Sequence, residues 1–139
     1  MLSLYKTLIR PIADYAAVVY GPMLTKDQGE RLERQQRQVL KVTFGHQVPY
    51  REIIEKYDIC KLSERRGQLL DQFIISTMKN EKYRDRWLPI RNTGARVLRS
   101  ERPFKEKHAR TERLKKSPLY TIRRRANELF AQGIITLNT

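Results

Sequence analysis

The sequence predicts an all-α protein, in which a small helical bundle is followed by a basic, partly irregular C-terminal segment that ends in a further helix. Apolar residues recur at three- and four-residue spacing through the first 80 residues, and no alternating pattern of useful length indicates a strand. Charge divides the chain in the same way: residues 1–83 carry a net charge of +4, and residues 84–125 carry +11 of the total of +14. We therefore expect a helical domain at residues 1–83 and a basic region at residues 84–139.

The first helix is expected over residues 2–20. It is apolar on most sides, which predicts the central core element of the bundle. Pro11 lacks a backbone N–H, so it either kinks this helix or opens a second one. The pair Gly21-Pro22 ends the element. The predicted inner face consists of Leu4, Leu8, Ile12, Ala16 and Val19.

A second helix is expected over residues 26–44, with Thr25 as its N-cap and Gly45 as its C-terminal stop. Its predicted inner face consists of Leu32, Gln36, Val39 and Thr43. A cationic stripe on the opposite side consists of Arg31, Arg34, Arg37 and Lys41. The stripe is either an ordinary solvated helix face or a phosphate-binding surface, and Glu30 and Glu33 offer it few acidic partners.

Two further helices complete the predicted bundle. A short one spans residues 50–57, with Ile53, Ile54 and Tyr57 packing inward, and a turn follows through Asp58 and Cys60. Ser63 then caps a long helix over residues 64–80. Its broad apolar face consists of Leu69, Leu70, Phe73, Ile74, Thr77 and Met78.

Beyond Tyr83 the helical period fades. Trp87 and Pro89 predict one turn and residues 92–94 another, and the chain to Lys116 is basic and irregular. A last amphipathic helix is expected over residues 119–132, with an apolar side formed by Leu119, Ile122, Ala126, Leu129 and Phe130.

Residues 109–125 read "ARTERLKKSPLYTIRRR" and contain one acidic residue, Glu112. Such a block of like charge predicts a polyanionic partner, with nucleic acid ahead of an anionic membrane surface. The candidate phosphate contacts are Arg110, Arg113, Lys115, Lys116, Arg123, Arg124 and Arg125. Pro118, Leu119 and Tyr120 would dock this strip onto the bundle. Alternatively, Tyr120 stacks on a base.

The sequence offers no recognisable catalytic constellation. It has no glycine-rich phosphate loop, nucleophile elbow or adjacent aspartate pair, so we expect no catalytic residue. Cys60 is the only cysteine, and His46 and His108 lack metal-site spacing, so neither a disulfide nor a bound metal or other cofactor is expected. Lys6, Arg10 and other interruptions argue against a signal peptide or membrane span. We expect an intracellular chain in the nucleus or cytoplasm.

The N-terminal stretch resembles the region just after the palm in reverse transcriptases of non-LTR retrotransposons (LINE-like, Jockey/CR1-type). The matching positions are Tyr5, Lys6, Leu8, Ile9, Arg10, Pro11, Tyr15, Ala16, Tyr20, Pro22, Leu32, Glu33, Gln36, Arg37 and Gly45. "KLSERRGQLLDQFI" resembles the next helix of the family, and "ARTERLKKSPL" resembles a basic stretch near its C-terminal end.

This resemblance implies a thumb-like element that grips a template–primer duplex by its backbone and contacts the palm and fingers of the parent enzyme. The palm's aromatic-x-Asp-Asp metal site is absent from this chain, so the resemblance implies a non-catalytic fragment or isolated domain. Two alternatives stay open: a free-standing helical RNA- or DNA-binding protein, and a helical interaction domain whose basic face meets an acidic protein.

Overall fold

The structure is a computed structural model that describes residues 2–91, 102–106 and 108–137. Within these residues the regular elements are helices, so the all-α prediction is confirmed. One isolated antiparallel bridge pairs Ile90 with Phe104. The chain divides into two compact units, Met1–Leu69 and Leu70–Thr139. The boundary expected after residue 83 falls inside α7 (Glu81–Trp87), which packs against α9 (Pro118–Ala131) in the second unit.

The N-terminal stretch forms several short helices rather than one. A helical run comprises α1 (Leu2–Leu4), a π-helical turn η1 (Tyr5–Ile9) and α2 (Arg10–Asp14), with Pro11 in the first turn of α2. The run ends where Ala16 adopts a left-handed conformation with φ of 52°. The short helix α3 (Ala17–Tyr20) and a 3₁₀ turn η2 (Gly21–Met23) follow. Of the two outcomes expected for Pro11, a kink or the start of a second helix, the structure shows the second.

The inner face predicted for this stretch is wrong. Leu8 is 60% exposed and Ile12 is 77% exposed, and Leu4, Ala16 and Val19 are exposed as well. The buried side chains are instead Tyr5 and Ala17. A segment that is apolar all round has no single inward face, so its pattern left the packed side undetermined.

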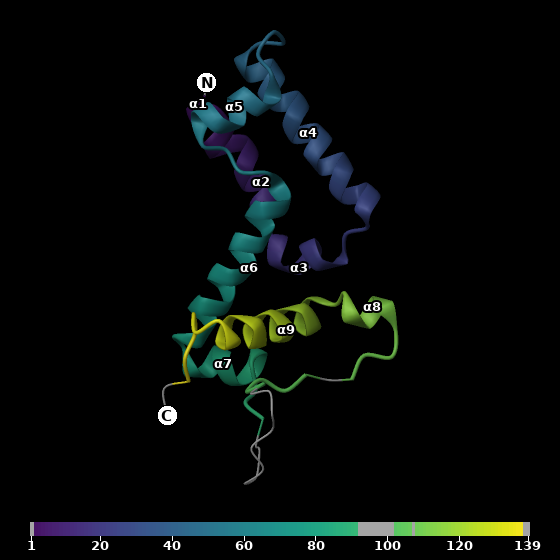
Figure 1. Cartoon of the computed structure of the whole chain (residues 1–139), viewed down its shortest axis with the longest axis vertical. Helices are drawn as coiled ribbons and strands as arrows, with labels where there is room; N and C mark the ends of the chain where they lie inside the picture. Colours follow the sequence, from purple (N-terminus) through teal and green to yellow (C-terminus); the bar gives the residue numbers. More distant parts are fainter. Residues whose placement is uncertain (1, 92–101, 107, 138–139) are drawn as a thin grey trace. The chain divides into compact units, whose positions relative to one another are not determined.

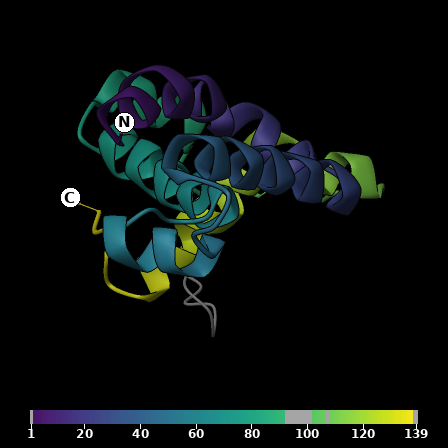
Figure 2. The same cartoon turned by 90° about the horizontal axis from the view of Figure 1, so that it is seen from above.

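Helix α4 (Lys26–Phe44) matches its predicted bounds and is one uninterrupted helix in both views (Figure 1 and Figure 2). Thr25 forms a capping box with Gln28, in which each side chain bonds the backbone N–H of the other residue. Gly45 follows the helix with φ of 98°, a conformation that glycine adopts without steric cost. Both predicted ends of this helix are confirmed.

The core of the first unit lies between the N-terminal helices, α4 and α5 (Tyr50–Tyr57). Its fully packed residues are Tyr5, Leu40, Ile53 and Ile59. Of the inner face predicted for α4, Gln36 is buried and the other three residues are half-buried, whereas Leu40 was missed. Phe44 and Tyr57 stack with ring centroids 4.4 Å apart at the edge of this core.

Gln36 is a polar residue within that core, and its amide is fully used. Its Nε2 donates to the Tyr5 hydroxyl at 2.9 Å and to the Cys60 carbonyl at 3.2 Å, while the Tyr50 hydroxyl donates to its Oε1 at 3.4 Å. Burial raises the pKa of both tyrosine hydroxyls, so they stay protonated. A satisfied network of this kind fixes the register of the N-terminal helices against α4.

Helix α6 (Leu62–Met78) begins in the first unit, where it is capped from α4 rather than by Ser63. The Glu33 carboxylate accepts hydrogen bonds from the backbone N–H groups of Ser63 at 2.7 Å and Leu62 at 3.4 Å. These N–H groups lack partners within their own helix, and a carboxylate also complements the positive end of the helix dipole. Glu33 is therefore a capping residue.

The second unit packs α7, α9 and the C-terminal part of α6 around its own core. In Figure 1, α7 and α9 lie side by side, in agreement with their contacts. The buried residues are Ile74, Thr77, Leu88, Phe104, Ile122, Arg123, Ala126, Asn127, Leu129 and Ile135. The predicted apolar side of α9 is confirmed at Ile122, Ala126 and Leu129, whereas Phe130 is half-buried and Leu119, at the start of the helix, is exposed. The turn predicted at Trp87 ends α7, whereas the turn at residues 92–94 lies outside the described residues.

Residues 102–106 lack a helical period, yet Phe104 anchors them to the core of the second unit. Phe104 is 1% exposed, and Asn127 of α9 holds its backbone by accepting from its N–H at 3.0 Å and donating to its carbonyl at 3.2 Å. The same Asn127 amide donates to the Glu106 carboxylate at 2.6 Å. A short helix α8 (Glu112–Lys115), capped by Thr111, then leads to α9.

Candidate nucleic-acid interface

The cationic stripe predicted on α4 lies away from the buried side of the helix. Arg31 and Arg34 are exposed, and neither forms an ion pair within the described part of the chain. Arg37 lies over the Tyr50 ring, with its guanidinium carbon 5.2 Å from the ring centroid. Lys41 is half-buried. The stripe therefore presents three exposed arginines, one of which also lies over the Tyr50 ring, and one lysine that is partly covered by the first unit.

The first half of the 110–125 strip is exposed. Arg110, Arg113 and Lys116 are open to solvent and have no acidic partner among the residues that the structure describes. Lys115 differs, because its ammonium contacts Glu112 at 2.6 Å. That hydrogen bond lowers the pKa of Glu112 and raises the pKa of Lys115. Because both groups are solvated, a phosphate can compete for Lys115.

The three consecutive arginines of α9 have three different environments. Successive residues of a helix point about 100° apart, so the side chains in a run of three point in directions spread over about 200°. Arg124 is exposed, with Glu128 3.7 Å away, whereas Arg123 and Arg125 turn toward the protein. The triplet was predicted as one phosphate-binding group, but the structure places only Arg124 fully at the surface.

Arg123 is 8% exposed and acts inside the second unit. Its Nε donates to the Trp87 carbonyl at 3.1 Å, and its Nη1 donates to the Lys105 carbonyl at 3.5 Å. Burial lowers the pKa of the guanidinium. The Trp87 carbonyl belongs to α7 and the Lys105 carbonyl to residues 102–106. By donating to both, Arg123 holds these two segments against α9.

Arg125 forms a bidentate ion pair with Asp71. Its Nε and Nη2 donate to the two carboxylate oxygens at 2.7 and 2.8 Å, and its Nη1 donates to Glu128 at 3.1 Å. These hydrogen bonds, with Asp71 first, raise the pKa of the guanidinium. A fork-to-fork pair of this geometry is among the stronger charge-assisted contacts, which leaves Arg125 little capacity for a phosphate.

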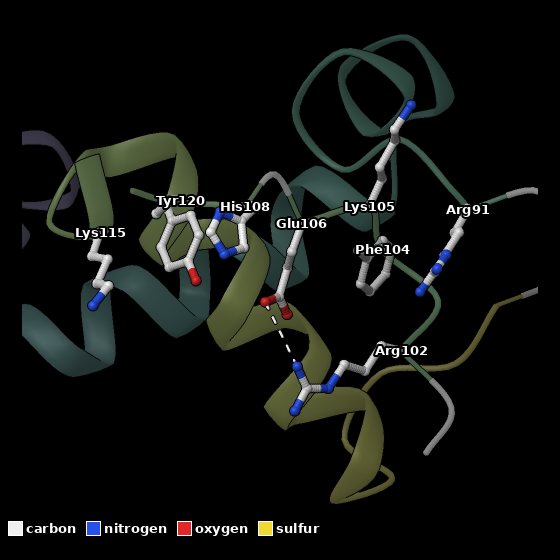
Figure 3. Close-up of a pocket in the computed structure, with 9 residues that line it drawn as sticks. Arg91, Arg102, Phe104, Lys105, Glu106, His108, Lys115 and Tyr120 are labelled. Carbon is white, nitrogen blue, oxygen red and sulfur yellow. Dashed lines mark ion pairs between the residues drawn. The ribbon is translucent and has the colours of Figure 1, made fainter. Parts of the chain in front are cut away.

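A groove of about 530 Å³ in the second unit gathers further cations (Figure 3). Arg91, Arg102, Lys105, His108 and Lys115 line it. Tyr120 also lines the groove and is half-buried, so it neither docks completely into the core nor stands free. Glu106 lies among these residues, held by Asn127 at 2.6 Å and by Arg102 at 3.9 Å.

The sequence prediction missed four of the groove's cationic or titratable residues: Arg91, Arg102, Lys105 and His108. They come from stretches without a helical period, which were treated as irregular. One signal was present: Pro103-Phe104 places a large aromatic residue in a basic segment, and such a residue often anchors its segment to a core. Folding then brings together side chains that flank this anchor.

The described surface of the second unit can thus contact phosphates through exposed cations from two places, the strip and the groove. No group of three or more potential metal ligands is found in the described residues, and none of their helices is both long and apolar enough to cross a bilayer. Comparison with protein-family models, curated proteins and solved structures finds no match to this chain.

Proposed function

We propose that this chain binds nucleic acid through its phosphate backbone and carries out no chemistry on it. The supporting observation is the set of exposed cations on the 110–125 strip, where Arg110, Arg113, Lys116 and Arg124 extend into solvent. A dense cationic surface without a matching acidic network is suited to a polyanion whose charges repeat along its length. The exposed stripe of α4, Arg31 and Arg34, provides a second such surface.

The resemblance noted in the sequence points to the same activity. It implies a thumb-like region of a non-LTR retrotransposon reverse transcriptase, which holds a template–primer duplex while the palm and fingers of the parent enzyme perform synthesis. Backbone contacts fit such a role, because a polymerase must hold every sequence that it copies. We propose the same assignment for this chain, as a non-catalytic part of such an enzyme.

The experiment is fluorescence anisotropy on several unrelated duplexes across a salt series. Each phosphate contact on duplex DNA contributes a slope of about −0.9 to the log–log dependence of affinity on salt. We expect a steep slope that is nearly the same for all sequences. The double variant Arg31→Ala/Arg34→Ala should flatten it by up to about 1.8.

The matched control is Lys79→Ala/Lys82→Ala, which removes two exposed lysines that belong to neither predicted surface. This control should leave the slope close to that of the wild-type chain. A slope near zero for the wild-type chain, or a strong preference for one duplex, would contradict the proposed function. Mg²⁺-dependent primer extension by the pure chain would contradict the non-catalytic assignment.

A further inference from the structure

The groove of the second unit is lined by Tyr120 and Glu106, and contacts to the phosphate backbone of a nucleic acid do not explain why these two side chains lie there. Figure 3 shows Lys115 at one end of the view and Arg91 at the other, with Tyr120, His108 and Glu106 between them. A surface that contacts only phosphates has no need of a half-buried aromatic ring. A carboxylate within such a surface also repels phosphate and therefore weakens its binding.

We propose that this groove binds one unpaired nucleotide of a single-stranded nucleic acid. Its base stacks on Tyr120, and its flanking phosphates contact Lys115 at one end and Arg91 at the other. The inference rests on the proposed function and deepens it, because it names single-stranded nucleic acid as the ligand of this part of the surface.

The aromatic ring favours an unpaired base. Base-on-aromatic stacking contributes about 1–3 kcal/mol per base and does not depend on base identity. In a duplex, both faces of a base are already covered by its neighbours, so a base reaches a recessed ring only from a single strand or after extrusion. Tyr120 lies in the groove wall rather than on an open helix face, which selects against the duplex.

The Glu106 carboxylate indicates which part of the ligand lies at the middle of the groove. Asn127 donates to one of its oxygens at 2.6 Å, and Arg102 contacts the other at the longer distance of 3.9 Å. Glu106 is therefore fixed in place, with accepting capacity remaining. Base amino groups and the ribose hydroxyl donate hydrogen bonds, and phosphates do not, so the carboxylate matches a nucleoside placed between two phosphates.

The size of the groove fits this ligand. Pockets of about 300–1,000 Å³ hold small molecules, and the groove has a volume of about 530 Å³. One nucleotide fills such a space, whereas a duplex cannot enter it. The cations near its ends then continue along the strand as backbone contacts.

The test compares a fluorescent single-stranded uridine homopolymer with a duplex of the same length, both by anisotropy at fixed salt. Tyr120→Leu keeps an apolar side chain but removes the stacking face, so it should weaken single-strand binding by about tenfold. It should change duplex binding by less than about twofold. Tyr83→Leu is the matched control, since Tyr83 is an exposed tyrosine of the same unit outside the groove. It should change neither affinity.

A second arm needs no variant. An oligomer in which abasic sites replace the bases keeps every phosphate, and it should bind the wild-type chain about as weakly as the homopolymer binds Tyr120→Leu. Equal affinity for the abasic and complete strands would overturn the inference, and so would equally strong competition by polyglutamate. If the chain binds duplexes with a steep salt slope but fails these tests, only this inference fails. Binding to neither nucleic acid would overturn the proposed function itself.

Discussion

Helices α4 and α9 are both amphipathic and basic, but they place their arginines differently. In α4 the cations are three or four residues apart, so they share the side opposite the core, and Arg31 and Arg34 extend into solvent. In α9 the arginines are consecutive, so the helix buries Arg123, pairs Arg125 with Asp71 and exposes Arg124. The spacing of charges along a helix, rather than their number, decides how many of them a ligand can reach.

The largest expected effect is the loss of stability of the second unit when Arg123 is replaced. Arg123→Ala leaves the Trp87 and Lys105 carbonyls without their donor and removes the packed stem of the side chain, so it should destabilise the second unit by about 2–3 kcal/mol. Trp87 is the only tryptophan, and its fluorescence during urea unfolding reports on this unit.

Arg124→Ala is the matched control for that experiment, because it removes the same charge one residue further along the helix. Its effect on unfolding should stay within about 0.5 kcal/mol, as for other exposed substitutions. Equal destabilisation by the two variants would contradict the distinct roles assigned to neighbouring arginines.

The next largest effect is expected when the Glu33 cap of α6 is removed. Glu33→Ala removes the acceptor for the first N–H groups of α6 and should cost about 1 kcal/mol. The direct measurement is hydrogen exchange at the Ser63 amide, which should become markedly faster. Glu30→Ala removes an exposed carboxylate of the same helix and should leave that exchange rate unchanged.

A smaller effect is expected for the ion pair between Arg125 and Asp71. Both side chains are about one-third exposed, so solvent screens the pair and a double-mutant cycle should give a coupling of about 0.5–1 kcal/mol. The cycle uses Arg125→Gln, Asp71→Asn and the double variant in the Trp87 unfolding assay. Zero coupling would show that this pair does not hold α9 against α6 in solution.

Elements with a clear helical period were predictable from the sequence. The bounds of α4 and α5, and the apolar side of α9 apart from Leu119, followed from spacing and from residues such as Thr25 and Gly45. The packing of the N-terminal stretch was not predictable, because its apolar residues occupy all sides of the helix. Only tertiary contacts determine that Tyr5 is buried. The irregular segment around Phe104 was missed for a related reason: its order comes from Asn127, which is distant in sequence.

The candidate site was predictable in part. The exposed cations of the strip were identified from the charge density of the sequence alone. The environments of Arg123 and Arg125 depend on acceptors at Trp87 and Asp71, which no local pattern connects to α9. Charge density therefore predicts a polyanionic partner, whereas the fold decides which side chains are accessible to it.

We propose that the exposed cations bind the polyanion and that the cations engaged within the fold do not. The measurement that tests it most directly is the salt dependence of duplex binding for two variants. Arg113→Ala/Lys116→Ala/Arg124→Ala removes three exposed cations, and Arg125→Gln/Asp71→Asn removes an internal ion pair without changing the net charge. We predict that the first flattens the log–log slope by up to about 2.7, whereas the second leaves it unchanged. Equal flattening by both variants, or an unchanged slope for the first, would contradict the account.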